Sequence, residues 1–299
     1  MSNWLISIEG TDAGRQAALI LALMAAVLHA LFGALQKGKH DPWLSRAAID
    51  LSYGLIAAPF ALFVVPWPEP HMWPIFAGAF VIHAVYKVLQ AMTYTRGAYT
   101  VVYPVVRGTG PLFTVAAAGV VFAETYAPMQ WAGVVMLTAG ILGLSAYNLS
   151  HLTQGRDTMI PALGFAVATG AMVAAYTTYD AWGIRATADP FTFLAWFFLI
   201  DGVFIPALMA RRLFTLPRAE VIPLMKRGVL GAFVAYFSFG AVMLATRLDR
   251  VGEAAVLRET STVFAALIGW LVLGEKVGRV PAVLMAVIAA GAVVMEMGG

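Results

Sequence analysis

The sequence predicts an all-α polytopic membrane protein, with ten transmembrane helices arranged as two inverted five-helix repeats. Three observations support this prediction: the composition, a series of bilayer-length apolar segments, and a match between the two halves of the chain. Hydrophobic residues make up 61% of the 299 residues and charged residues only 12%, against about half and about a quarter in soluble domains. Because a soluble surface needs polar cover, this composition excludes a water-soluble enzyme, a nucleic-acid-binding domain and a disordered chain.

Apolar segments follow one another along the chain, each near the 20 residues that cross about 30 Å of hydrocarbon. Short runs rich in proline, glycine and charge separate them, as at 66–70 and 211–212. The first 16 residues carry two acids and one arginine, whereas a secretory signal begins with a basic region, so we expect the first segment to be a retained span. The predicted spans are 17–36, 45–65, 72–94, 99–121, 128–148, 160–180, 190–210, 228–247, 252–272 and 279–297.

Basic residues are distributed unevenly over the loops. The loops after odd-numbered spans hold twelve, namely Lys37, Lys39, Arg46, Arg96, Arg156, Arg211, Arg212, Arg218, Lys226, Arg227, Lys276 and Arg279. The other side holds four, namely Arg15, Arg185, Arg247 and Arg250. Because cytoplasmic loops are enriched in Lys and Arg, this distribution predicts that both termini are extracytoplasmic. We expect a multi-pass protein of the plasma membrane, which in a bacterium is the inner membrane.

An offset of 151 residues aligns polar residues of the two halves. The matched pairs include Asp50 with Asp201, Arg96 with Arg247, Arg107 with Arg258, Thr109 with Thr260 and Glu124 with Glu275. Polar matches in register are informative, because apolar matches arise often by chance between membrane helices. Each half, 17–148 and 160–297, then contains five spans, and an odd number turns the second half upside down. Such inverted repeats are typical of secondary transporters, whose site lies between the halves.

Two stretches and the acidic loops after them resemble a known family. Residues 102–112, which contain Tyr103, Pro104 and Arg107, and residues 257–266 resemble the fourth-helix segments of EamA-type transporters of the drug/metabolite transporter superfamily. The resemblance covers 86–145 and 237–296. It implies a ten-helix carrier of small metabolites, usually an exporter of amino acids or related compounds. The chain departs from the family at Ala123, where glycine is usual, and in having no glutamate in its first span.

Arginine and aspartate inside the predicted spans are candidate site residues, because ionisable groups are costly in lipid. Their comparable depths within the predicted spans favour two ion pairs, Asp50 with Arg107 and Asp201 with Arg258. These pairs either lock helices together or act as alternating gates. Alternatively, the arginines bind an anionic group, since the guanidinium fork suits a carboxylate or a phosphonate.

His83 and Lys87 are four residues apart on one predicted helix and share a face, with Tyr86 beside them. We expect them to line an aqueous cavity, because lipid does not tolerate a buried lysine. Glu259 is either a proton-coupling carboxylate or a partner for a basic side chain.

Three further residues complete the candidate set. Tyr103 belongs to the segment that resembles the family, and Tyr176 can line the same cavity, as can Tyr179 and Asp180 unless they lie at the membrane interface. His29 is either a coupling group or a packing histidine.

Chemistry other than transport has little support in the sequence. The chain has no cysteine, no metal-ligand pattern and no nucleophile motif, and His40 stands where a phosphate-binding loop requires Ser or Thr. An integral-membrane enzyme and a channel are therefore less favoured, and we expect no enzymatic activity, cofactor, metal or nucleic-acid partner. The leading hypothesis is a secondary active transporter that exports a small amino-acid-like or other anionic or zwitterionic metabolite by alternating access. Protons are a candidate coupling ion, and a multidrug or lipophilic-cation pump of the same superfamily is the alternative.

Overall fold

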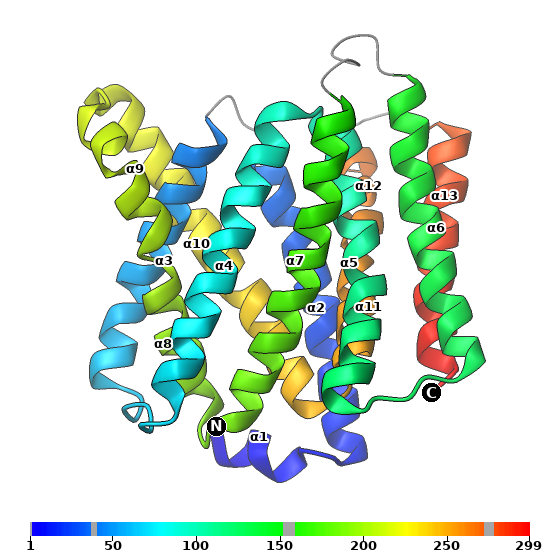
Figure 1. Ribbon diagram of the computed structural model, residues 1–299, viewed down its shortest axis with the longest axis horizontal. Helices are drawn as coiled ribbons and strands as arrows, with labels where there is room; N and C mark the ends of the chain where they lie inside the picture. The colour runs from blue at the N-terminus through cyan, green and yellow to red at the C-terminus, as the bar shows by residue number, and fades with distance from the viewer. Residues whose placement is uncertain (1, 37–40, 152–158, 272–277) are drawn as a thin grey trace.

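The computed structural model describes residues 2–36, 41–151, 159–271 and 278–299. All regular elements in these ranges are helices, and the long helices run side by side through one bundle, with both chain termini at the same end (Figure 1). The predicted all-α membrane fold is confirmed. Five charged residues of the sequence predictions lie outside the described ranges, namely Lys37, Lys39, Arg156, Glu275 and Lys276, and so does His40.

The first half of the chain begins with a short helix that the spans did not predict, at the end of the bundle where both termini lie (Figure 1). Five long helices follow it. The elements are α1 (Ser2–Ile8), α2 (Asp12–Gln36), α3 (Pro42–Phe63), α4 (Met72–Arg96), α5 (Tyr99–Phe122) and α6 (Pro128–Ser150). Asp41 caps α3, because its carboxylate accepts hydrogen bonds from the backbone N–H groups of Trp43 and Leu44.

The second half divides two of the predicted spans. Its elements are α7 (Met159–Ala186), α8 (Pro190–Asp201), α9 (Phe204–Thr215), α10 (Arg218–Leu248), α11 (Val251–Glu259), α12 (Ser261–Leu271) and α13 (Arg279–Met297). Within the described ranges, nine segments are long and apolar enough to cross a membrane, counting Pro190–Thr215 as one. The predicted span 252–272 is divided between α11 and α12, each of which is too short to cross alone.

The break between α8 and α9 has a local cause. Pro206 lacks the N–H that would bond the Gly202 carbonyl, so a continuous helix loses support there. Gly202 also lies against the backbone of α3: a Cβ at this position would be 2.8 Å from both the Asp50 carbonyl oxygen and the Gly54 Cα. The helix therefore breaks where only glycine fits, and Asp201 stands at the end of α8.

Helices of the two halves pack directly on one another, α3 on α8, α5 on α11 and α6 on α13. The α6–α13 contact is a close backbone approach, because a Cβ on Gly133 would be 2.5 Å from the Met295 nitrogen and one on Gly291 would be 2.5 Å from the Leu137 nitrogen. An aromatic core between α4 and α8 includes the stacked rings of Phe76 and Phe193, 5.5 Å apart. These contacts enclose the polar residues of the bundle interior.

Candidate functional site

Lys87 of α4 lies at the centre of a buried polar cluster, which we call the lysine cluster. Its Nζ is 2.7 Å from Asp50 Oδ2 and 2.8 Å from Asp201 Oδ1. The same nitrogen donates hydrogen bonds to the Asp201 carbonyl oxygen at 2.7 Å and to the Tyr53 hydroxyl at 3.0 Å. Lys87 is 1% exposed, so its charge is stabilised by these oxygens rather than by water. The lysine cluster consists of Arg46, Asp50, Tyr53, Lys87 and Asp201.

The ends and spacings of the helices place these partners. Arg46 and Asp50 are one turn apart on α3, and Arg46 Nε is 2.7 Å from Asp50 Oδ1. Tyr53 donates its hydroxyl proton to Asp201 Oδ2. The Asp201 carbonyl is available to Lys87 because α8 ends at this residue.

His83 lies one turn before Lys87 and contacts a different carboxylate, forming what we call the histidine pair. Its Nε2 is 2.8 Å from Oδ2 of Asp180 on α7, and its Nδ1 is 3.9 Å from Asp201 Oδ1. The imidazole packs against the rings of Tyr176 and Phe197 at 4.7 and 4.9 Å between centroids. Asp180 is therefore a buried residue of the polar interior, and it lines a cavity there.

Arg107, Arg258 and Glu259 form a second buried cluster, the arginine cluster. Arg107 Nε is 2.7 Å from Glu259 Oε2, and Arg258 Nε is 3.3 Å from Glu259 Oε1. Arg258 also donates to the Thr177 hydroxyl at 3.5 Å. Two permanent cations thus share one carboxylate, which leaves the arginine cluster with an excess of positive charge.

The structure contradicts the expected pairs Asp50–Arg107 and Asp201–Arg258. Asp50 is held by Arg46 and Lys87, and Asp201 by Lys87 and Tyr53. The two arginines meet at Glu259 instead, because α5 packs on α11 and Glu259 is the last residue of α11. Equal depth in the membrane therefore did not predict the ion-pair partners. Lys87 contacts Asp50 of the first half and Asp201 of the second, so neither aspartate pairs with the arginine at its own depth.

Several donors of this interior lack a hydrogen-bond partner among the residues that the structure describes. They include Nη2 of Arg107, Nη2 of Arg258 and the hydroxyl of Tyr176. Asp180 Oδ1 is a buried acceptor that also lacks a hydrogen-bond partner among the described residues. Because a buried polar group without a partner is costly, these atoms mark a place suited to a polar ligand.

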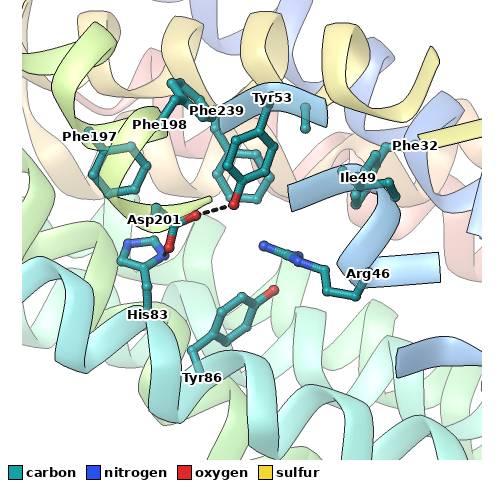
Figure 2. A pocket seen from close by; sticks show the side chains of 11 residues that line it. Phe32, Arg46, Ile49, Tyr53, His83, Tyr86, Phe197, Phe198, Asp201 and Phe239 are labelled. Carbon is teal, nitrogen blue, oxygen red and sulfur yellow. Dashed lines mark hydrogen bonds and ion pairs between the residues drawn. The ribbon is translucent and has the colours of Figure 1, made fainter. Parts of the chain in front are cut away.

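Two small cavities lie beside the clusters. The first is lined by groups of the lysine cluster and by His83 and Tyr86, with phenylalanine rings opposite (Figure 2). The second is lined by Tyr176, Asp180 and Arg258 among others, and shares Phe239 with the first. Each has a cavity volume of about 10 Å³, which is roughly the room that one water molecule needs. Side chains therefore nearly fill each of these two cavities.

The remaining predicted residues differ in their contacts. Tyr86 accepts a hydrogen bond from Gln90 at 2.6 Å and packs on Tyr176 at 4.8 Å. Tyr103 lies with its ring 6.0 Å from the Arg107 guanidinium, within reach of a cation–π contact. His29 contacts the rings of Phe32 and Phe239.

The sequence interpretation missed Arg46 and Tyr53 as site residues. Arg46 was counted as a loop charge because it stands one residue inside the second predicted span. Its spacing of four from Asp50 was the available signal, since helical neighbours at that distance form ion pairs. Tyr53 carried no comparable signal, because its partner Asp201 lies in the other half of the chain.

The bundle is closed at the end that carries α1 by contacts between the halves. Glu124, in the loop after α5, accepts hydrogen bonds from the backbone N–H groups of Val251 at 2.8 Å and Gly252 at 3.3 Å, at the start of α11. Tyr126 donates its hydroxyl proton to Glu124. Burial and the adjacent Glu124 carboxylate raise the pKa of Tyr126, so the hydroxyl stays protonated and keeps this bond. No group of three or more His, Asp or Glu side chains in the described ranges is placed to hold a metal ion.

Comparison with known proteins gives a fold for the chain and a family match for its second half. The crystal structure of another protein superposes with a TM-score of 0.73 and 19% sequence identity, over 95% of this chain and 98% of the other. At this identity the likeness shows the fold alone. No curated protein matches the sequence. Residues 160–297 match the sequence profile of the EamA-like transporter family. Residues 160–297, the second half of the chain, are thus similar to the EamA-like transporter family, and the described ranges hold nine helical segments that are long and apolar enough to cross a membrane.

Proposed function

We propose that this protein is a secondary active transporter that exports a small anionic or zwitterionic metabolite of amino-acid-like chemistry by alternating access. The observation that supports this most directly is the arginine cluster. Two buried guanidinium groups share one carboxylate, and each has a nitrogen without a protein partner in the part of the chain that the structure describes. An anion at this place would supply both the missing charge and the missing acceptors.

The planar donors of arginine match the oxygens of a carboxylate or a phosphonate. Arg107 comes from the first half of the chain and Arg258 from the second, so an anion held by both would be held between the halves. This is the position of substrate sites in carriers built from inverted repeats. We propose that residues 17–148 and 160–297 are such repeats.

The cavity beside the arginine cluster favours a substrate that also carries an amino group. Asp180 and Arg258 line the same cavity, and Asp180 Oδ1 has no hydrogen-bond partner among the described residues. A zwitterion would place its carboxylate toward the arginine and its ammonium group toward the aspartate. Opposite charges on two walls therefore select for a small molecule with both charges.

The small size of both cavities supports alternating access rather than a channel. With about one water's room beside each cluster, a metabolite can enter only after helices separate. The contacts of Glu124 with α11 would open at one end of the bundle and re-form in each cycle.

Flux into proteoliposomes tests the proposal. Purified protein is reconstituted and supplied with radiolabelled glycine, acetate or the lipophilic cation tetraphenylphosphonium. We expect saturable flux of glycine or acetate in the wild type and a loss of at least tenfold in Arg107→Ala. Arg211→Ala is the control, because Arg211 is exposed on α9. Flux of tetraphenylphosphonium alone would contradict the proposal and support a lipophilic-cation pump.

A further inference from the structure

The buried charges of the described interior balance when His83 is neutral. All lie in or beside the lysine and arginine clusters and the histidine pair. The cations are Arg46, Lys87, Arg107 and Arg258, and the carboxylates are Asp50, Asp180, Asp201 and Glu259. An anion that enters this interior therefore leaves one negative charge uncompensated, unless a proton enters with it.

The charge is not balanced evenly within the interior. Asp50 and Asp201 contact Lys87 directly, and Glu259 contacts two arginines. Among the described residues, the ion-pair partner of Asp180 is His83, whose charge depends on protonation. The carboxylate without a permanent cation is thus the one bonded to the titratable histidine.

We propose that His83 and Asp180 form a proton-binding site that takes up one proton when an anion occupies the arginine cluster. The two ligands would then be carried together, in the same direction. This inference rests on the proposed function and deepens it, since it names the coupling ion and the residues that bind it. Export of the anion would proceed while its outward gradient exceeds the inward gradient of protons.

The geometry provides an atom for the added proton. With Nε2–H donating to Asp180 Oδ2 at 2.8 Å, the neutral imidazole keeps its lone pair on Nδ1. A proton taken from water binds Nδ1, which lies 3.9 Å from Asp201 Oδ1. The product is an imidazolium between two carboxylates, and no other bond forms or breaks.

The groups around the pair are compatible with this step. Tyr176 of α7 and Tyr86 of α4 pack on the His83 ring. Tyr53 of α3 and Asp201 of α8 line the same cavity as His83 (Figure 2). The cations nearest the pair already have carboxylate partners: Lys87 and Arg46 contact Asp50, Lys87 also contacts Asp201, and Arg258 contacts Glu259. The arginine cluster has one positive charge in excess, since Arg107 and Arg258 share Glu259, and Asp180 offsets that charge in the overall balance. An anion added at the arginine cluster therefore leaves the charge of Asp180 uncompensated.

The route from anion to proton site is short. Arg258 and Asp180 line one cavity, and Thr177, which accepts a hydrogen bond from Arg258, belongs to the same lining, on α7 one turn before Asp180. In a buried interior of low dielectric constant, charges that line the same cavity interact strongly. A zwitterion brings its own positive charge, so it should bind without proton uptake.

Calorimetry of the purified full-length protein tests the inference. Acetate and glycine are titrated in two buffers with different ionisation enthalpies, which gives the protons taken up per ligand bound. We expect about one proton with acetate and none with glycine. The acetate Kd should rise about tenfold per pH unit on the alkaline side, as linkage of one proton requires.

Variants identify the residues. Asp180→Asn removes one negative charge, so its acetate binding should lose both the proton uptake and the pH dependence. His83→Gln should weaken acetate binding at neutral pH by at least tenfold. His71→Gln is the matched control, because His71 is an exposed histidine 3.5 Å from Glu69, and it should keep the wild-type stoichiometry.

Each outcome is decisive. Acetate binding to the wild type without proton uptake overturns the inference and leaves the proposed function standing, whether or not the variants fold. Unchanged proton uptake in Asp180→Asn also overturns it. If neither acetate nor glycine binds, the proposed function fails and this inference fails with it.

Discussion

Gly54 and Gly202 meet backbone to backbone, and their contact holds Asp50 and Asp201 on either side of Lys87. A Cβ at Gly202 would lie 2.8 Å from the Gly54 Cα, so neither helix can carry a side chain there without moving. Both aspartates reach one lysine nitrogen within 2.8 Å. A packing feature of two helices thereby fixes the geometry of the lysine cluster.

Gly202→Ala should destabilise the protein, because the added methyl group must displace the backbone of α3. Overpacking of this kind costs about 1–3 kcal/mol, and thermal unfolding in detergent measures it. Gly164→Ala is the matched control, since nothing lies within 4 Å of a Cβ at Gly164. It should be neutral or slightly stabilising. Equal melting temperatures for wild type and Gly202→Ala would show that α3 and α8 can move apart without loss of stability.

Lys87→Met should abolish flux and destabilise the fold. The substitution leaves Asp50 and Asp201 buried, with Arg46 as the remaining cation of the lysine cluster. Breaking a buried ion pair costs about 3–5 kcal/mol of stability. Lys87→Met/Asp201→Asn should regain part of the stability, because one uncompensated charge is removed, but not the flux. Lys226→Met, at an exposed position of α10, controls for the substitution. Normal transport by Lys87→Met with an unchanged pH profile would remove Lys87 from the mechanism.

Hydropathy predicted the spans well because a bilayer requires long apolar runs regardless of tertiary contacts. The break at 202–203 was not predicted, although Pro206 lies inside the span, because proline is tolerated in membrane helices. The sequence of the predicted span 252–272 contains no feature that predicted its division at Thr260 into α11 and α12. These breaks place Asp201 and Glu259 at helix ends within the bundle.

Partners inside the bundle were the least predictable feature. Spacing along one helix related His83 to Lys87, and it could have related Arg46 to Asp50. The contact of Arg107 with Glu259 joins residues of different halves, and only the packing of α5 on α11 brings it about. Residue type and depth in the membrane therefore identified most of the buried charged residues, Arg46 excepted, but not their partners.

Arg107→Ala and Arg258→Ala should act in the same direction, because both arginines contact Glu259 and neither forms the pair that its depth suggested. Loss of either should weaken binding of an anionic probe such as acetate by about 2–5 kcal/mol. Calorimetry measures the affinity, with Arg211→Ala as the control. Opposite changes in the accessibility of the two ends of the bundle would contradict this expectation and favour separate gates.

The last prediction concerns the closed end of the bundle. Glu124 bonds the first two N–H groups of α11, and losing such a cap costs about 0.5–2 kcal/mol. The chain has no cysteine, so a cysteine placed at buried Ala255 of α11 is its sole thiol. Adding Glu124→Ala should speed labelling of that thiol from the α1 end about 5–30-fold, which corresponds to 1–2 kcal/mol. Glu124→Gln keeps an acceptor and should show a smaller rise, and Glu69→Ala should show none. Unchanged labelling in Glu124→Ala would mean that other contacts close this end.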